Sequence, residues 1–386
     1  MTSTTKTRRR VLIVHALVVV VCLVGCGPSW EVSLSRPDGS AFHVDSAVLS
    51  GLEEFAEPVQ GQQAIPLERV LVSAGHTAVD TLRVVNEDGV DESRFEWRLI
   101  ADRAWWFRDG SLLIGESRLQ ASQVKVEPST LLPQVAASIT DIAPTACIAL
   151  GLPLPSQATG TPLDVAEAER VALIFMDGFG YVRYTEALAE GLIPRLEMMG
   201  EPLLALTTYP PITSVSTASL LTGAPPSVHG VDTRGIRKTG TETLFDVAAS
   251  AGLKVVAVEG ESLSFALRNA ELQLSADLDG NGSTDDNVFT KALGVLSDEA
   301  PDLLFVHFHG IDDAGHSYGP GAGEERVIIQ EEDEAVGRIV ELLPQGTLAI
   351  IFADHGMHEV NEEGRLGNHG HLIDSDIYVP IFLVRK

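Results

Sequence analysis

The stretch "PDLLFVHFHGIDDAGHSYGP", Pro301 to Pro320, joins a continuous apolar run to a cluster of acids and histidines. A short run that is apolar at every position is typical of a strand buried on both faces of a parallel sheet. Similar runs at Val171 to Met176 and Leu348 to Ala353 alternate with amphipathic stretches such as 324–343. From about Glu167 onward, this alternation predicts an α/β fold in which a mostly parallel central sheet is covered by helices on both faces.

The region from Trp30 to about Pro128 differs, because its short runs alternate apolar and polar residues. Asp-Gly pairs at 88–89 and 109–110 break these runs, which predicts strands joined by tight turns. We therefore expect a smaller β-rich N-terminal domain over 26–128, followed by a catalytic domain over 129–386. No motif in the first region indicates chemistry.

Residues 1–25 have the pattern of a secretory signal peptide, in which basic residues precede an apolar run, here Val11 to Val24. That run is shorter than the roughly 20 residues of a membrane-spanning helix. The tetrapeptide Leu23-Val24-Gly25-Cys26 resembles the lipobox of bacterial lipoproteins, which implies cleavage before Cys26 and a lipid on that cysteine. An uncleaved anchor helix is the alternative. Both predict an exported, membrane-anchored protein, and the lipobox implies a lipoprotein of the bacterial cell envelope.

Charge and cysteine content narrow the function classes. The formal net charge of -27 argues against a nucleic-acid-binding surface. If Cys22 is removed with the signal and Cys26 carries a lipid, Cys147 has no intramolecular partner and no disulfide is expected. A chain of 386 residues is long enough for well-buried cores in two domains. An anionic substrate would need a local reversal of the negative field.

Carboxylates and imidazoles follow three of the predicted strands, and another histidine precedes the last apolar run, "IYVPIFLV". In parallel sheets, ligands bind at the carboxyl ends of the strands. A mixed set of aspartates and histidines at that edge suits zinc or a similar divalent ion. Any single member would by itself fit a helix cap or a buried polar group. The set is Asp177, Asp312, His316, Asp354, His355 and His369.

Five motifs occur together: "LIFMDGFGY", "PITSVSTASLLTGAPPSVHG", "DDAGHSYGP", "FADHGM" and "GNHG". In order and approximate spacing, roughly residues 168–386 resemble the type I phosphodiesterase/nucleotide pyrophosphatase family of the alkaline phosphatase superfamily. The resemblance implies an alkaline phosphatase-like fold and a hydrolase that uses two zinc-type ions on a small phosphoryl ester. By position, one ion, which activates the nucleophile, would be held by Asp177, Asp354 and His355. The other would be held by Asp312, His316 and His369.

The same resemblance assigns a nucleophile, because family members place a threonine or serine six residues before a "SLxTG" segment. Counting back from Ser219 gives Thr213. A threonine hydroxyl is a weak nucleophile unless a metal or a base removes its proton. A helix that starts after Thr213 would direct its first amides toward the phosphoryl oxygens. Ser214 is the alternative nucleophile. The other hydroxyls are expected to cap the helix or bond to its backbone, and they are Ser216, Thr217, Ser219 and Thr222.

Two features of the sequence bear on the substrate class. Ser216 occupies the position where nucleotide pyrophosphatases of the family carry an asparagine, a departure that weakens the substrate assignment. No arginine flanks Thr213 as a doubly charged monoester would favour, and Arg234 and Arg237 lie further along the chain. A diester or related phosphoryl substrate is favoured over a monoester. The alternatives are a phosphomonoesterase, a phosphoryl transferase or mutase of the same superfamily, and a surface-binding lipoprotein without catalytic activity.

The segment "DLDGNGSTDD", Asp277 to Asp286, resembles an EF-hand calcium loop. Asp277, Asp279 and Asn281 stand at alternate positions, but the twelfth position is Val288 where an acid is expected. A calcium site and a solvated turn both remain open. Four further histidines near the motifs are expected to have structural or supporting roles, and they are His307, His309, His358 and His371.

A last expectation concerns "DIAPT", which in many members of the superfamily follows the final strand of the fold but here precedes Asp177. Asp141 would cap a helix and Pro144 would lie in its first turn. We expect a helix over Ile142 to Leu152 that packs on the catalytic sheet near Ile377 to Val384.

Overall fold

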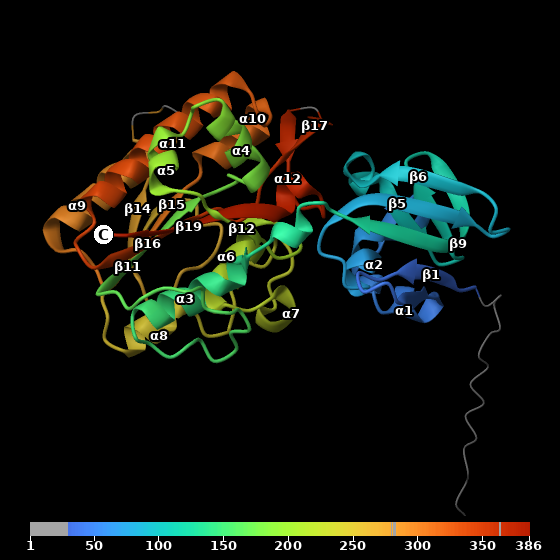
Figure 1. Cartoon of the computed structure of the whole chain (residues 1–386), viewed down its shortest axis with the longest axis horizontal. Helices are drawn as coiled ribbons and strands as arrows, with labels where there is room; N and C mark the ends of the chain where they lie inside the picture. Colours follow the sequence, from blue (N-terminus) through green and yellow to red (C-terminus); the bar gives the residue numbers. More distant parts are fainter. Residues whose placement is uncertain (1–29, 279, 281–282, 363) are drawn as a thin grey trace, which may run out of the picture.

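The computed structural model describes residues 30–278, 280, 283–362 and 364–386 (Figure 1). The predicted signal peptide and the predicted lipidation site, Cys26, lie outside these residues, as do Asp279 and Asn281 of the predicted calcium loop. Asp277 is described, and its Oδ1 accepts a hydrogen bond of 2.8 Å from Gly280 N. Val288, the twelfth position of that loop, is fully buried in the core. The calcium site stays a prediction.

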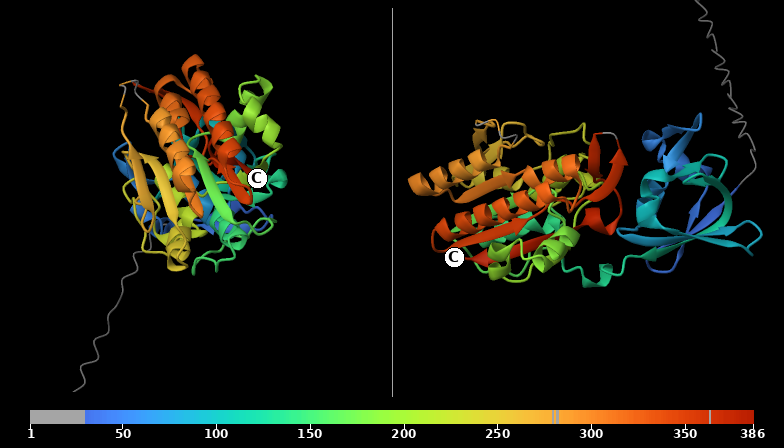
Figure 2. Two further views of the ribbon diagram at one scale, coloured as in Figure 1. Left: turned by 90° about the vertical axis from the view of Figure 1, so that its left-hand side faces the viewer. Right: turned by 90° about the horizontal axis from the view of Figure 1, so that it is seen from above.

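The N-terminal region is built on one curved, mainly antiparallel sheet (Figure 2). Its path is β2-β1-β9-β8-β7-β4-β3, with β5 paired to β9 and β6 paired to β5. The strands are β1 Val32–Ser35, β2 Ala41–Val44, β3 Glu57–Val59, β4 Gln62–Pro66, β5 Val79–Asn86, β6 Glu92–Glu96, β7 Ala104–Phe107, β8 Ser111–Ile114 and β9 Ser117–Pro128. The helices are α1 Ser46–Ser50 and α2 Leu67–Ser73, with 3-10 turns at Glu53–Phe55, Trp97–Leu99 and Ala101–Arg103. Trp97 and Trp106 fill the core of this region.

The second sheet has the order β10-β12-β19-β16-β11-β15-β13-β14. All its pairings are parallel except those of β19 with β12 and β16. Its strands are β10 Ala137–Ser138, β11 Arg170–Met176, β12 Leu203–Leu206, β13 Val255–Gly260, β14 Glu271–Ser275, β15 Leu303–Phe308, β16 Thr347–Phe352 and β19 Tyr378–Arg385. A separate hairpin is formed by β17 His358–Glu362 and β18 Arg365–Asn368. β15 and β16 are buried at every position, as their continuous apolar sequences predict.

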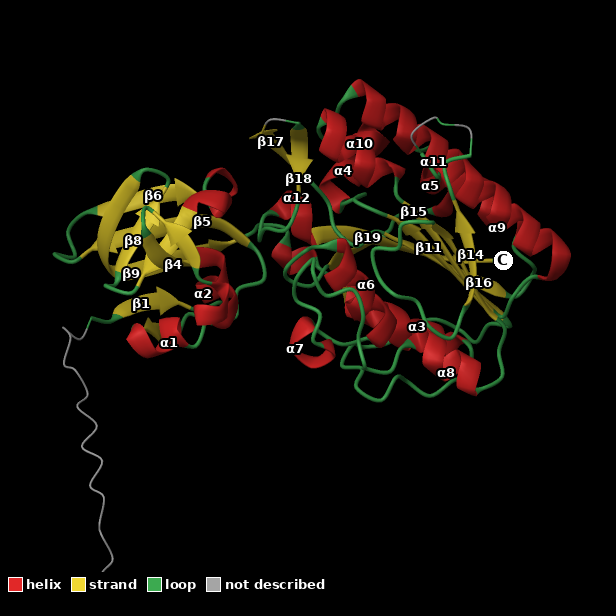
Figure 3. Cartoon of the chain, turned by 180° about the vertical axis from the view of Figure 1, so that it is seen from behind, coloured by secondary structure: helices red, strands yellow, loops and turns green. Residues whose placement is uncertain are grey.

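Helices cover both faces of this sheet (Figure 3). On one side lie α4 Tyr181–Ala189, α5 Pro194–Met199, α9 Asp285–Glu299, α10 Gly310–Tyr318 and α11 Gly323–Leu342. On the other lie α3 Ile142–Ala149, α6 Thr213–Thr222 and α8 Leu244–Ser250. Short helices are α7 Pro226–His229 and α12 Asp374–Ile377, with 3-10 turns at Leu132–Gln134 and Ile139–Asp141. The predicted α/β class with a preceding β-rich region is confirmed. No helix among the described residues combines the length and apolar character needed to cross a membrane.

The predicted helix after "DIAPT" forms, with three differences from expectation. α3 ends at Ala149, and its main contacts are with β11, α6 and α8 rather than with β19. The loop that follows α3 leads back to β11, and Ala149 O accepts a bond of 2.7 Å from Ala168 N just before that strand. The Asp141 carboxylate bonds Ser138 N and Thr161 N, so it caps the preceding 3-10 turn instead of α3. The domain limits at 128 and 129 stay a prediction.

Candidate active site

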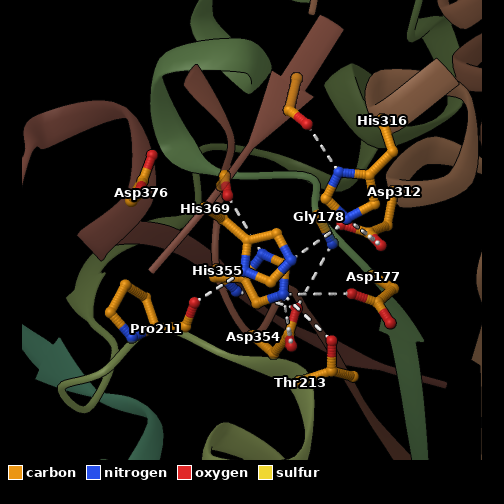
Figure 4. A network of polar contacts seen from close by, with 12 residues as sticks. Asp177, Gly178, Pro211, Thr213, Asp312, His316, Asp354, His355, His369 and Asp376 are labelled. Atoms are coloured by element: carbon orange, nitrogen blue, oxygen red, sulfur yellow. Dashed lines mark hydrogen bonds and ion pairs between the residues drawn. The ribbon is translucent and has the colours of Figure 1, made fainter. Parts of the chain in front are cut away.

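The first group of predicted metal ligands lies at the carboxyl ends of β11 and β16. These strands are parallel neighbours, so Asp177 and the Asp354-His355 pair leave the sheet side by side. All three residues are buried. His355 Nε2 lies 3.2 Å from Asp354 Oδ2 and 3.5 Å from Asp177 Oδ1 (Figure 4).

The second group comes from α10 and the β18 hairpin. Asp312 and His316 are one helical turn apart, with His316 Nε2 at 3.2 Å from Asp312 Oδ2. His369, just after β18, places Nε2 at 3.7 Å from Asp312 Oδ1, and its ring stacks on that of His355 at 3.7 Å. Gly178 permits this approach of α10, since a Cβ there would stand 3.0 Å from the Asp312 Cα.

All six predicted ligands therefore meet in one site, with one difference in grouping. The ligand atoms of Asp312, His355 and His369 lie within 4.8 Å of one another, as do those of Asp177, Asp354 and His355. His355 thus faces both groups. His316 stays beside Asp312, where the Arg365 guanidinium lies 2.9 Å from its Nε2.

The three histidines share one orientation that suits metal binding. Each places Nδ1 against a backbone carbonyl, so that Nδ1 carries the proton and donates it while Nε2 presents a lone pair to the site (Figure 4). The lone pairs face carboxylate oxygens, an arrangement that suits a cation between them. The bonds are His316 to Gly367 O at 2.8 Å, His355 to Gly356 O at 3.0 Å and His369 to Pro211 O at 2.8 Å.

The carboxylates also fit a bound cation. Asp177 Oδ1, Asp312 Oδ1 and Asp354 Oδ2 are buried and have no hydrogen-bond partner in the described part of the chain. Burying a carboxylate charge without a partner costs roughly several kcal/mol. Burial and the neighbouring charges of Asp177 and Asp312 raise the pKa of Asp354 well above its usual range. Oxygen and imidazole donors of this kind suit zinc or manganese.

Thr213 is the first residue of α6, and its Oγ1 lies 3.2 Å from His355 Nε2. The hydroxyl of Ser214, the alternative nucleophile, is directed elsewhere, toward Thr233 O at 3.5 Å. Ser216 is fully buried and bonds Thr207 Oγ1 at 3.0 Å. Of the remaining hydroxyls, Ser219 and Thr222 bond backbone carbonyls within the helix, as expected.

Two arginines lie at the site, of which the sequence left Arg234 without a placement and gave no indication of Arg365. Arg234, in the loop after α7, places Nη2 at 3.2 Å from His369 Nε2, and Arg365 lies on the hairpin beside His316. Burial and the nearby charge of Arg365 lower the pKa of Arg234. Arg234 lies 21 residues after Thr213 in the sequence, and no local pattern indicates that the loop returns to the metal ligands.

Comparison with known proteins agrees with this geometry. Over residues 171–379, more than half of the chain, the sequence matches the type I phosphodiesterase / nucleotide pyrophosphatase family. The chain belongs to this family. Its members are hydrolases that act on phosphoric ester bonds, which is the class that the motifs predict.

Individual relatives match this phosphodiesterase-family chain only in part. Venom phosphodiesterase from Macrovipera lebetinus is 24% identical over 224 residues, which cover 50% of this chain and 26% of the relative. GPI ethanolamine phosphate transferase 3 from Schizosaccharomyces pombe is 33% identical over 86 residues, which cover 22% of this chain and 9% of the relative. The chain thus spans about a quarter or less of the length of these curated relatives.

Solved structures with a similar arrangement are distant in sequence. Murine ectonucleotide pyrophosphatase / phosphodiesterase 5 has a TM-score of 0.44 and 13% identity, and the match covers 57% of this chain and 88% of that one. Phosphonoacetate hydrolase from Sinorhizobium meliloti has a TM-score of 0.38 and 20% identity, and the match covers 55% and 59% of the two chains.

The N-terminal region of this family member also contacts the loop that carries a ligand. Glu68 of α2 is buried and accepts bonds from His371 Nδ1 at 3.0 Å, Leu372 N at 3.1 Å and the Tyr209 hydroxyl at 3.1 Å. Burial alone would lower the pKa of His371, but the charge of Glu68 and its hydrogen bond raise it to about 9. A cavity of about 250 Å³ beside His369 is lined by residues of both regions, including Arg69 and Trp105. The β-rich region therefore forms one wall beside the site.

Proposed function

We propose that this chain hydrolyses a phosphodiester with Thr213 as nucleophile and two divalent ions. Zinc is the proposed metal. The observation that carries the proposal is the set of three histidines whose Nε2 lone pairs converge on buried carboxylate oxygens beside the Thr213 hydroxyl. Asp177, Asp354 and His355 would hold one ion. The other would be held by Asp312, His316 and His369.

When bound, the ions would lower the pKa of the Thr213 hydroxyl and offset negative charge on the phosphoryl oxygens. The Thr213 Oγ1 would attack phosphorus, the bond from phosphorus to the alcohol oxygen would break, and the alcohol would leave. Water would then hydrolyse the phosphothreonine. The amides of Val215 and Ser216 already bond Ile212 O, so the amides of Thr213 and Ser214 are the ones that would donate to the phosphoryl oxygens.

Two alternatives each have an observation in their favour. Arg234 at His369 supplies a fixed positive charge that a doubly charged phosphomonoester would use. The partial similarity to GPI ethanolamine phosphate transferases fits a transferase, which differs only in the alcohol that accepts the phosphoryl group.

The test is a substrate panel with the purified protein in zinc or manganese. Aryl phosphodiester, phosphomonoester, phosphonate and sulfate ester are compared, with and without added alcohol acceptors. The proposal predicts the highest kcat/KM for the diester and release of free alcohol and phosphomonoester. Faster turnover of the monoester, or transfer to the alcohol in preference to water, would replace it with the corresponding alternative.

We also propose that the protein is an exported lipoprotein held at a membrane through Cys26, on the strength of the sequence pattern at 23–26. Expression of Cys26→Ala in a bacterial host tests this. The wild type is expected in the membrane fraction and should incorporate labelled palmitate. The variant should incorporate none. Equal labelling of both would contradict the proposal.

A further inference from the structure

A second cluster of titratable side chains lies on the far side of Asp177 from the other five predicted ligands. His307 is the fifth residue of β15, His309 follows that strand, and Glu259 is near the end of β13. β15 lies between β11 and β13 in the sheet, so Asp177, His307 and Glu259 stand on three adjacent strand ends. His307, Asp177 and Glu259 are buried, and the His309 side chain is 18% exposed.

Each imidazole is bound from one side by the same carboxylate. Glu259 Oε1 lies 2.8 Å from His307 Nδ1, and Glu259 Oε2 lies 3.0 Å from His309 Nε2. These are ordinary hydrogen-bond lengths. The His307 ring is further fixed by stacking on Phe175, with centroids 3.7 Å apart and planes 4° apart. One carboxylate therefore orients two imidazoles, as a carboxylate does for metal-binding histidines.

The opposite ring nitrogens both face one oxygen of Asp177, at longer distances. His307 Nε2 and His309 Nδ1 lie 3.2 and 3.5 Å from Asp177 Oδ2. A hydrogen bond between an imidazolium and a carboxylate is about 2.7–2.9 Å long. Two ligands of a tetrahedral zinc ion, each bound at 2.0–2.1 Å, lie about 3.3–3.4 Å apart. The measured spacing fits two ligands around an ion better than a direct ion pair.

The arrangement of the two rings gives the same result. Their centroids lie 3.8 Å apart, each ring has one nitrogen bonded to Glu259, and the other nitrogen of each faces Asp177 Oδ2. A cation between these two nitrogens and Asp177 Oδ2 would satisfy all three atoms. We propose that Asp177 Oδ2, His307 Nε2 and His309 Nδ1 bind a third divalent transition-metal ion, with the exposed edge of His309 leaving a position for water.

This site is separate from the six predicted ligands except at Asp177, whose Oδ1 faces His355 while Oδ2 faces His307. The third ion therefore fixes the orientation of the Asp177 carboxylate. Under this proposal, His307 and His309 would be ligands instead of having the supporting roles expected from the sequence.

Anomalous diffraction from crystals of the purified protein grown with zinc tests the proposal directly. We expect a peak within bonding distance of Asp177 Oδ2, His307 Nε2 and His309 Nδ1. Zinc peaks at the other ligands with none here would overturn the inference and leave the proposed hydrolase intact. A peak here in a protein that hydrolyses no ester would support the inference while the proposed function failed.

Zinc stoichiometry in solution provides a matched comparison. His309→Gln should bind one zinc fewer per chain than the wild type, and Glu259→Gln should weaken one site about 10- to 100-fold. His358→Gln is the control, because the His358 side chain is 17% exposed and bonds Asp376, outside both sets. It should bind as many zinc ions as the wild type. Equal stoichiometry and affinity in His309→Gln and the wild type would contradict the site.

Discussion

Replacing Asp354 with asparagine should stabilise the metal-free protein, although a buried active-site carboxylate is removed. Asp354 Oδ1 accepts bonds from Gly178 N at 3.3 Å and His355 N at 2.8 Å, and an asparagine oxygen can accept both. The other oxygen, Oδ2, has no hydrogen-bond partner among the described residues. An amide nitrogen in its place can donate to the facing carboxylate of Asp177, so repulsion is exchanged for attraction.

The magnitude follows from the spacing of the two carboxylates. Their ligand oxygens lie within 4.8 Å of each other, which corresponds to a repulsion of at least about 3.5 kcal/mol at an effective dielectric constant of 20. Protonation of Asp354 relieves part of this, because its pKa is raised well above the usual range. We therefore expect the free energy of unfolding to rise by about 1–3 kcal/mol near neutral pH.

The pH dependence has a definite sign. A carboxyl group whose pKa is higher in the folded protein favours folding when protonated, and that contribution is lost as the pH rises through the folded pKa. The advantage of Asp354→Asn should therefore be small in acid and grow with pH. The assay is urea unfolding of the wild type and the variant from acid to neutral pH, once with a metal chelator and once with excess zinc.

Zinc should reverse the order of stability, since the wild type gains binding energy that the variant largely loses. Asp376→Asn is the control, because this buried carboxylate already has partners, His371 N at 3.0 Å and His358 Nδ1 at 2.8 Å. It should destabilise the protein with or without zinc. If Asp354→Asn destabilised the metal-free protein as much as Asp376→Asn does, the account of the site as a cluster of unpaired carboxylates would be refuted.

Three further results are expected. Thr213→Ala should lose turnover by several orders of magnitude with unchanged zinc content, and Thr213→Ser should recover a measurable part of kcat; activity retained in Thr213→Ala would exclude the nucleophile. The pKa of about 9 at His371 should give wild-type stability that falls as the pH rises through that value, whereas Glu68→Gln should lose about 2–3 kcal/mol and show a flatter profile by pH-dependent thermal unfolding. Arg183→Gln leaves the buried Glu325 without its ion-pair partner at 2.8 Å, so urea unfolding should detect a loss of about 3–5 kcal/mol, and a loss below 1 kcal/mol would contradict it.

Much of the site was predictable because its signals are local. The continuous apolar runs of β11, β15 and β16 identify buried parallel strands, and a residue that follows such a strand is necessarily at the carboxyl edge. Asp312 and His316 have the spacing of one helical turn, which places both on one face of α10. The position of Thr213 came from family motifs.

The remainder depends on long-range packing that has no local pattern. Glu259 meets His307 only because β13 and β15 are paired in a particular register. Arg234 reaches His369 through an irregular loop, and Glu68 approaches His371 from helix α2 of the N-terminal region. The predicted packing of α3 beside β19 was wrong for the same reason, because its contacts with β11 depend on the path of the loop that follows it.

The stereochemical course at phosphorus tests the central claim most directly. A phosphodiester analogue with a chiral phosphorothioate centre is hydrolysed in isotopically labelled water, and the configuration of the product is determined. Attack by Thr213 followed by attack by water gives two in-line displacements, so the account predicts retention of configuration. Inversion would show a single direct displacement by water and would contradict Thr213 as the nucleophile.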